Sequence, residues 1–154
     1  MSEHAIANAK GWADTIRLYA LGLDQDNWDR LEELREDPSE DPEDPEELAE
    51  LERMAAEFQD CSDAGEVREH ANESALSVEL SGTWTPGETP EADSYIILLS
   101  TGGPALRIVG NLGRYGSPSS ATMQWQDWGE PWTDIREAEE DDLLAFVSCF
   151  YLGE

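Results

Sequence analysis

Apolar residues recur at steps of three and four near the beginning of the chain. From Ala5 to Leu23 they are Ile6, Trp12, Ala13, Ile16, Tyr19, Ala20 and Leu23. This spacing places them along one side of an α-helix. We therefore expect an amphipathic helix from Ala5 to Leu23.

A second helix is expected directly afterwards. Its apolar residues again follow three-residue steps, at Trp28, Leu31 and Leu34. Either Asp24 or Asp26 is placed to cap its N-terminus, because a carboxylate accepts hydrogen bonds from the free backbone N–H groups there. The helix should end before Pro38, whose ring disfavours helical backbone at the preceding residue.

A proline-rich acidic segment then interrupts the helical pattern. Pro38, Pro42 and Pro45 stand among acids in DPSEDPEDPEE, so residues 37–46 should form an exposed, extended linker. Pro45 also suits the first turn of a third helix. The apolar stripe of that helix consists of Leu48, Leu51, Met54, Ala55 and Phe58. A short helix from Asp63 to about Asn72 should follow.

A period of two replaces the helical period after residue 75. Leu76, Val78 and Leu80 alternate with polar residues, which predicts a half-buried strand. Residues 84–93 are rich in turn formers and should form a loop. The segments SYIILLS (94–100) and ALRIVGNL (105–112) flank Gly102 and Gly103, a pair that suits the tight reversal of a hairpin.

The last part of the chain predicts one more strand and one more helix. After a turn at residues 114–119, apolar and polar residues alternate in ATMQWQDW (121–128). From Asp134 to Gly153, acids precede a wide apolar face made of Leu143, Leu144, Phe146, Val147 and Phe150.

These elements predict an α+β fold in a single domain, residues 1–154. Residues 1–74 should form the acidic helical part, with its linker at 37–46. Residues 75–154 should form an antiparallel sheet of about four strands and a C-terminal helix.

The charge of the chain is strongly negative and unevenly spread. Thirty-six acids and nine bases give a net charge of −27, and residues 24–60 hold seventeen acids against three arginines. The acid density along such a stretch is comparable to that of phosphates along a DNA strand, roughly one per 3.4 Å. Lys10 is the one lysine, a composition that also suits a GC-rich or halophilic source.

This charge constrains the partners and the location. An acidic surface repels nucleic acids and anionic membranes, so we expect a basic protein partner, no direct nucleic-acid binding and no membrane association. The sequence has no long apolar window and no basic-then-apolar leader, and its two cysteines do not form a disulfide framework. These features predict a cytoplasmic protein.

Candidate metal and catalytic chemistry is weak. The segment DQDNWDRLEELR begins like a calcium loop, but Asp29 replaces the required glycine and Arg35 replaces the final glutamate. His4 and His70 are expected to be solvated. Acidic neighbours should raise the thiol pKa of Cys61, and Cys149 should pack in the core. We predict no metal, no cofactor and no enzymatic activity.

The segment WQDWGEPW (125–132) permits two interpretations. Acids between its tryptophans are typical of a surface that receives arginine or lysine, through Asp127, Trp128 and Glu130. Alternatively, the tryptophans cover the small core.

The segments LLSTGGPALRIVG, QWQDWGEPWT and LLAFVSCFYLGE resemble a family of small acidic proteins carried by bacteriophages and other mobile elements. The resemblance covers Leu76 to Glu154. It implies a mobile-element setting, where small acidic proteins that disable host defence are common, and it brings no assigned site residues.

The charge and the resemblance together predict an anti-defence inhibitor, similar in character to DNA-mimicking anti-CRISPR and anti-restriction proteins. Its acids would occupy the basic nucleic-acid-binding surface of a host complex. The expected partner-binding residues are Asp24, Asp26, Asp29, Glu32, Glu33, Glu36, Asp37, Glu40, Asp41, Glu43, Asp44, Glu46, Glu47 and Glu50.

Two alternatives remain open at this point. One is a non-enzymatic interaction or structural protein whose acids maintain solubility, and the other is a carboxylate-based enzyme. The sequence does not decide the oligomeric state or the defence system.

Overall fold

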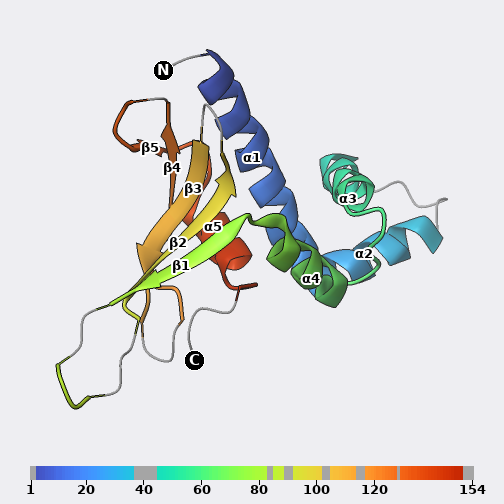
Figure 1. Ribbon diagram of the computed structural model, residues 1–154. Coiled ribbons are helices and arrows are strands. Elements are labelled where there is room, and N and C mark those ends of the chain that lie inside the picture. Colours follow the sequence, from blue (N-terminus) through green and yellow to red (C-terminus); the bar gives the residue numbers. More distant parts are fainter. Residues whose placement is uncertain are drawn as a thin grey trace.

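A computed structural model of the protein describes residues 3–36, 45–82, 85–88, 92–101, 105–113, 117–127 and 129–150. It has the predicted α+β fold (Figure 1). The helices within the described residues are α1 (Glu3–Gly22), α2 (Gln25–Glu36), α3 (Pro45–Glu57), α4 (Ala64–Ser74) and α5 (Glu140–Val147). The strands are β1 (Ser77–Ser81), β2 (Ser94–Ser100), β3 (Ala105–Asn111), β4 (Thr122–Gln126) and β5 (Thr133–Ile135).

Aspartates mark the beginnings of two helices. The Asp24 carboxylate accepts a hydrogen bond from the backbone N–H of Asp26 at 3.0 Å, so Asp24 and not Asp26 caps α2. Asp63 caps α4 by accepting from the backbone N–H of Glu66 at 2.9 Å. The helix α2 ends at Glu36, before Pro38, and α3 begins at Pro45. The linker predicted at residues 37–46 otherwise lies outside the described residues.

The sheet is an antiparallel meander in the order β1-β2-β3-β4-β5. Five strands replace the expected four or so, because Thr133–Ile135 pairs with β4. The predicted helix from Asp134 to Gly153 is therefore wrong in its first part. Ile135 is buried opposite Met123, and α5 begins at Glu140, where three acids in the first turn favour the helix N-terminus. Gly102 and Gly103 lie outside the described residues.

The helices lie together on one side of the sheet. Figure 1 shows α5 behind the strands, between them and α1, while α2 and α3 lie on the far side of α1. Tyr19 of α1 connects α5 with the end of α3. Its ring lies 4.9 Å from that of Phe58, the residue directly after α3, and 4.9 Å from that of Phe146 in α5. The buried side chains form one contiguous core.

Burial along β1 differs from the expectation of a half-buried strand. Val78 and Leu80 pair with Ile97 and Tyr95, which are buried, yet they are 37% and 40% exposed. Paired residues in an antiparallel sheet point to the same face, so both side chains lie on the helical side. The alternation correctly predicts the strand, but its burial is wrong because the helices cover the neighbouring strands and leave the edge strand open.

Candidate functional site

An acidic surface runs along α2. Five exposed carboxylates belong to this helix: Asp26, Asp29, Glu32, Glu33 and Glu36. At 3.6 residues per turn they fall within an arc of about 120°, along about 15 Å of helix. The mean rise between them, roughly 4 Å, is close to the spacing of phosphates along one DNA strand, roughly 3.4 Å.

The opposite side of α2 anchors the helix. Trp28 and Leu31 are buried, and the indole N–H of Trp28 donates a 2.7 Å hydrogen bond to the carbonyl oxygen of Gly22. That bond ties α2 to the end of α1, while Leu34 packs against the core from a half-buried position. The acidic stripe is thus held on a docked helix.

Two arginines connect α2 to α3. Arg35 makes a two-bond contact with the Glu52 carboxylate, at 2.7 and 3.1 Å, and Arg30 lies 3.3 Å from Glu47 and 3.5 Å from Glu33. The Arg35 guanidinium lowers the pKa of the Glu52 carboxyl by hydrogen bonding. These pairs are exposed and individually weak, and two of them link α2 to α3.

The acids of α3 are less uniform than those of α2. Glu46 is exposed, whereas Glu47 and Glu50 are half-buried and lie beside cations. Arg17 of α1 lies 2.7 Å from Glu50, and this hydrogen bond raises the pKa of Arg17. The hollow lined by Glu46, Glu47, Ala49, Glu50 and Arg53 is open to solvent, and these described lining residues all belong to α3.

A second acidic region, which the sequence interpretation did not select, lies at the start of α5. The run Glu137, Glu139, Glu140, Asp141 and Asp142 precedes the apolar part of this helix. Glu139 and Asp142 also raise the pKa of Arg17, so they lie close to the arginine that contacts Glu50. Burial raises the pKa of Asp142, while Arg17 lowers it. The only signal in the sequence was five acids in six residues, which is also typical of a helix start.

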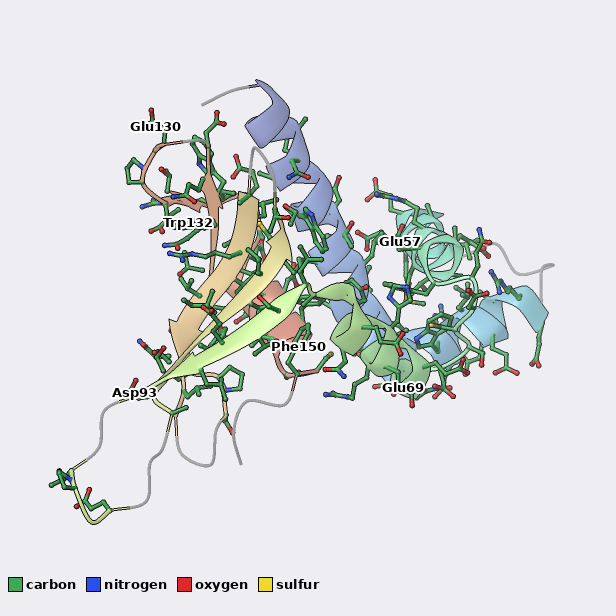
Figure 2. All side chains as sticks on the ribbon, viewed as in Figure 1. Glu57, Glu69, Asp93, Glu130, Trp132 and Phe150 are labelled. Atoms are coloured by element: carbon green, nitrogen blue, oxygen red, sulfur yellow. The ribbon has the colours of Figure 1, made fainter. Side chains whose placement is uncertain are left out.

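The remaining predicted partner-binding residues have different placements. Asp24 is exposed immediately before α2. Asp37, Glu40, Asp41, Glu43, Asp44 and Trp128 lie outside the described residues. Asp127 follows β4 in a half-buried position, and Glu130 is exposed. Figure 2 shows Glu130 and Trp132 at the end of the sheet near the start of α1, far from Glu57 of α3 and Glu69 of α4. The structure therefore does not bring the two predicted contact regions together.

The tryptophans of the aromatic segment have separate roles. Trp125 is buried in the core. Trp132 is half-buried, and the guanidinium carbon of Arg107 lies 3.9 Å from its ring centroid. Arg107 also donates a 2.9 Å hydrogen bond to Gln124. The segment thus does receive an arginine, and this arginine belongs to the same chain.

The two cysteines and His70 lie close to the helical core. Burial and neighbouring acids raise the thiol pKa of Cys61, and burial raises that of Cys149 to about 11. Both thiols are therefore weak nucleophiles at neutral pH. Nδ1 of the exposed His70 lies 2.6 Å from the Tyr19 hydroxyl, so the ring is not purely solvated as expected.

Among the described residues no group of three or more potential ligands is arranged to hold a metal ion. In the same residues no helix combines the length and apolarity that crossing a membrane requires. Comparisons of the chain with protein-family models, with curated proteins and with solved structures found no match.

Proposed function

We propose that the protein is an anti-defence inhibitor, encoded by a phage or another mobile element, that occupies the nucleic-acid-binding surface of a host CRISPR or restriction complex. It acts in the cytoplasm of the host cell and requires no cofactor and no catalysis. The acids of α2 are the centre of the contact. Its partner is a basic DNA- or RNA-binding protein complex.

The observation that carries this proposal is the stripe of five exposed carboxylates on α2. A basic channel built for DNA presents lysines and arginines at the spacing of phosphates, and the stripe offers carboxylates at a similar spacing. Because α2 is docked through Trp28 and Leu31, little ordering of the helix is required when the partner binds. Opposite charge also accelerates the encounter at low salt.

The resemblance of the C-terminal half to small mobile-element proteins adds the biological setting. The arginines of the acidic stretch support the same proposal in a different way. Arg30 and Arg35 each contact a glutamate of α3, and Arg30 also lies 3.5 Å from Glu33 of the stripe, so the outer side of α2 is predominantly negative.

A displacement assay tests the proposal. Purified CRISPR effector complexes and restriction endonucleases are each loaded with a fluorescent DNA duplex, and DNA release by the protein is followed by anisotropy. We expect the protein to release DNA from at least one complex, with a potency that falls steeply as salt rises. Release of DNA from none of them contradicts the proposal.

Two variants with the same net charge sharpen the test. One neutralises the stripe, through D26N, D29N, E32Q, E33Q and E36Q. The matched control neutralises five exposed acids outside α2, through E69Q, E73Q, E88Q, D93N and E137Q, so both have a net charge of −22 instead of −27. The stripe variant should lose displacement and the control should keep it. Equal loss in both would show that total charge matters and the stripe does not.

A further inference from the structure

The free edge of β1 combines two features that both suit an additional strand. First, β1 is the outermost strand of the sheet in the order β1-β2-β3-β4-β5, so among the described residues one side of its backbone has no neighbouring strand. A sheet edge of this kind presents N–H and C=O groups that can pair with another extended chain. The other edge, β5, has only three residues and offers a much shorter template.

Second, the apolar side chains of this edge are uncovered among the described residues. Leu76 is 60% exposed, and the large apolar side chains that are exposed there all belong to this segment: Leu76, Val78 and Leu80. The β2 partners of Val78 and Leu80, Ile97 and Tyr95, are fully buried, so the helical layer ends between β2 and β1. An added strand would extend the sheet and cover these side chains with its own apolar residues.

Features that normally prevent a sheet edge from pairing with another chain, such as proline, lysine and bulges, are sparse on β1. The strand contains no proline and no lysine, and the irregularity in the β2–β3 pairing lies on the far side of β2. Its charged residue is Glu79, which pairs with Ile96 and therefore points to the face opposite the helices. Such a row of apolar residues on an open edge strand would otherwise favour aggregation.

Charge selects the class of occupant. A second copy of the chain pairing antiparallel with full overlap would place Glu79 opposite Glu79, because residue 79 is the centre of β1. It would also bring together two chains with a net charge of −27 each. A basic segment instead places a positive side chain opposite Glu79 and gains from the net charge of the protein.

We propose that the edge of β1 is a docking site for an extended segment of a partner protein in which apolar residues alternate with lysine or arginine. The apolar residues cover Leu76, Val78 and Leu80, and a basic residue lies opposite Glu79 on the other face. The backbone of the segment pairs with β1 as a sixth strand of the sheet. This inference concerns a different surface from the stripe on α2 and does not depend on the proposed function.

The probe is a capped heptapeptide that alternates lysine and valine, titrated into isotope-labelled protein and followed by NMR. We expect the backbone amide signals of Ser77–Ser81 to shift. A block peptide of identical composition, with its lysines before its valines, should bind about tenfold more weakly because it cannot cover the apolar row. A peptide N-methylated along one edge should lose binding at β1, since it cannot donate to the strand.

The variant V78T/L80T tests the apolar contact by placing threonine, a residue that strands favour, at both positions. The side chains are 37% and 40% exposed, so the melting temperature should fall only modestly, and binding of the alternating peptide should fall about tenfold or more. E79Q should weaken binding and reduce its dependence on salt.

Three results would overturn the proposal. One is the absence of shifts at β1 with the alternating peptide at millimolar concentration. Another is binding that shifts only the acidic residues of α2 and α5 and does not distinguish the peptides, which indicates attraction by charge alone. The third is a dimer in sedimentation that V78T/L80T dissociates, which would identify a second copy as the occupant.

Discussion

Gly110 of β3 has a requirement that follows from its neighbours. It pairs with Tyr95, whose hydroxyl crosses it to donate a 2.6 Å hydrogen bond to the carbonyl oxygen of Ser120. A Cβ atom at residue 110 would collide with that carbonyl group and with the tyrosine hydroxyl. Because one of the colliding groups is backbone, the strain cannot be relieved by rotating a side chain.

We therefore expect G110A to lower the free energy of unfolding by about 2–3 kcal/mol, as overpacking does in a closely packed sheet. Urea unfolding followed by tryptophan fluorescence measures the change. The matched control is G11A in α1, where an added Cβ meets nothing within 4 Å. Alanine there should stabilise the protein by about 0.5–1 kcal/mol. A G110A protein as stable as the wild type would contradict this interpretation.

The thiol of Cys149 and the hydroxyl of Tyr19 predict a loss of stability at high pH. Burial raises the pKa of Cys149 from 9.0 to about 11 and that of Tyr19 from 10.0 to about 12. In the unfolded chain these groups ionise at their ordinary values, so above about pH 9 the unfolded state gains a stabilisation that the folded state lacks. The contribution of these two groups to the free energy of unfolding is therefore fully present below about pH 9. It is lost as the pH rises toward the folded-state pKa values, about 11 for Cys149 and about 12 for Tyr19.

Between about pH 8 and about pH 10.5 the free energy of unfolding should fall by about 2 kcal/mol from these two groups. Urea titrations at several pH values measure the slope. The variant Y19F/C149A removes both ionisations, and its stability should depend less on pH over the same interval. An unchanged slope would mean that the two groups do not account for the alkaline sensitivity.

At the scale of elements, the position of α2 depends strongly on Trp28. W28A removes a buried ring and its hydrogen bond to Gly22, so we expect a destabilisation of about 3 kcal/mol or more. Hydrogen exchange should show lost protection in α2 with protection retained in β2–β4. W28F keeps an aromatic ring at this position but loses the hydrogen bond to Gly22, and it should preserve most of the docking.

W28A also separates charge from organisation, because it leaves the net charge at −27. If the stripe acts as an ordered row of carboxylates, DNA displacement should weaken at least about tenfold in W28A and should be near wild type in W28F. Displacement that survives complete loss of α2 protection would show that an unstructured acidic segment is sufficient.

Most elements follow from local patterns that the fold did not override. Three- and four-residue spacing predicts α1, α2 and α3, and Asp63 indicates the start of α4. The alternation of residues 94–100 and 105–112 predicts β2 and β3. The strand β5 could not be predicted in this way, because three residues are too few to show a period. Its position depends on pairing with Met123, which no local pattern encodes.

The candidate site was predictable only in part. Sequence spacing indicates that α2 is amphipathic and that its acids therefore share the outer side. It does not indicate that Arg17 lies beside Glu50 and near Asp142, because those residues are distant in sequence and meet only through the packing of α1. The exposure of Leu76, Val78 and Leu80 could not be predicted from the sequence either. Alternation indicates which side chains share a face, but it does not indicate whether a helix covers that face.

At the scale of the whole molecule, the net charge of −27 destabilises the folded chain but favours binding to a basic partner. Repulsion among the acids destabilises the folded chain, so screening should stabilise it. We expect the melting temperature to rise over the first few hundred millimolar of sodium chloride and then to level off, because the screening length is already roughly 10 Å at 0.1 M. A protein adapted to a halophilic cell would instead continue to gain stability at molar salt.

The same salt should weaken displacement of DNA from a partner, since screening reduces attraction between the carboxylates and basic residues. Stability and inhibition should therefore change in opposite directions over one salt series, measured by thermal melting and by anisotropy in matched buffers. If stability rises while inhibition falls, unfolding is excluded as the cause of the lost inhibition. Neutralising the stripe on α2 should make the melting temperature less dependent on salt and abolish displacement. If inhibition and stability rose together with salt, the acids would serve the fold, and contact by the stripe on α2 would be excluded.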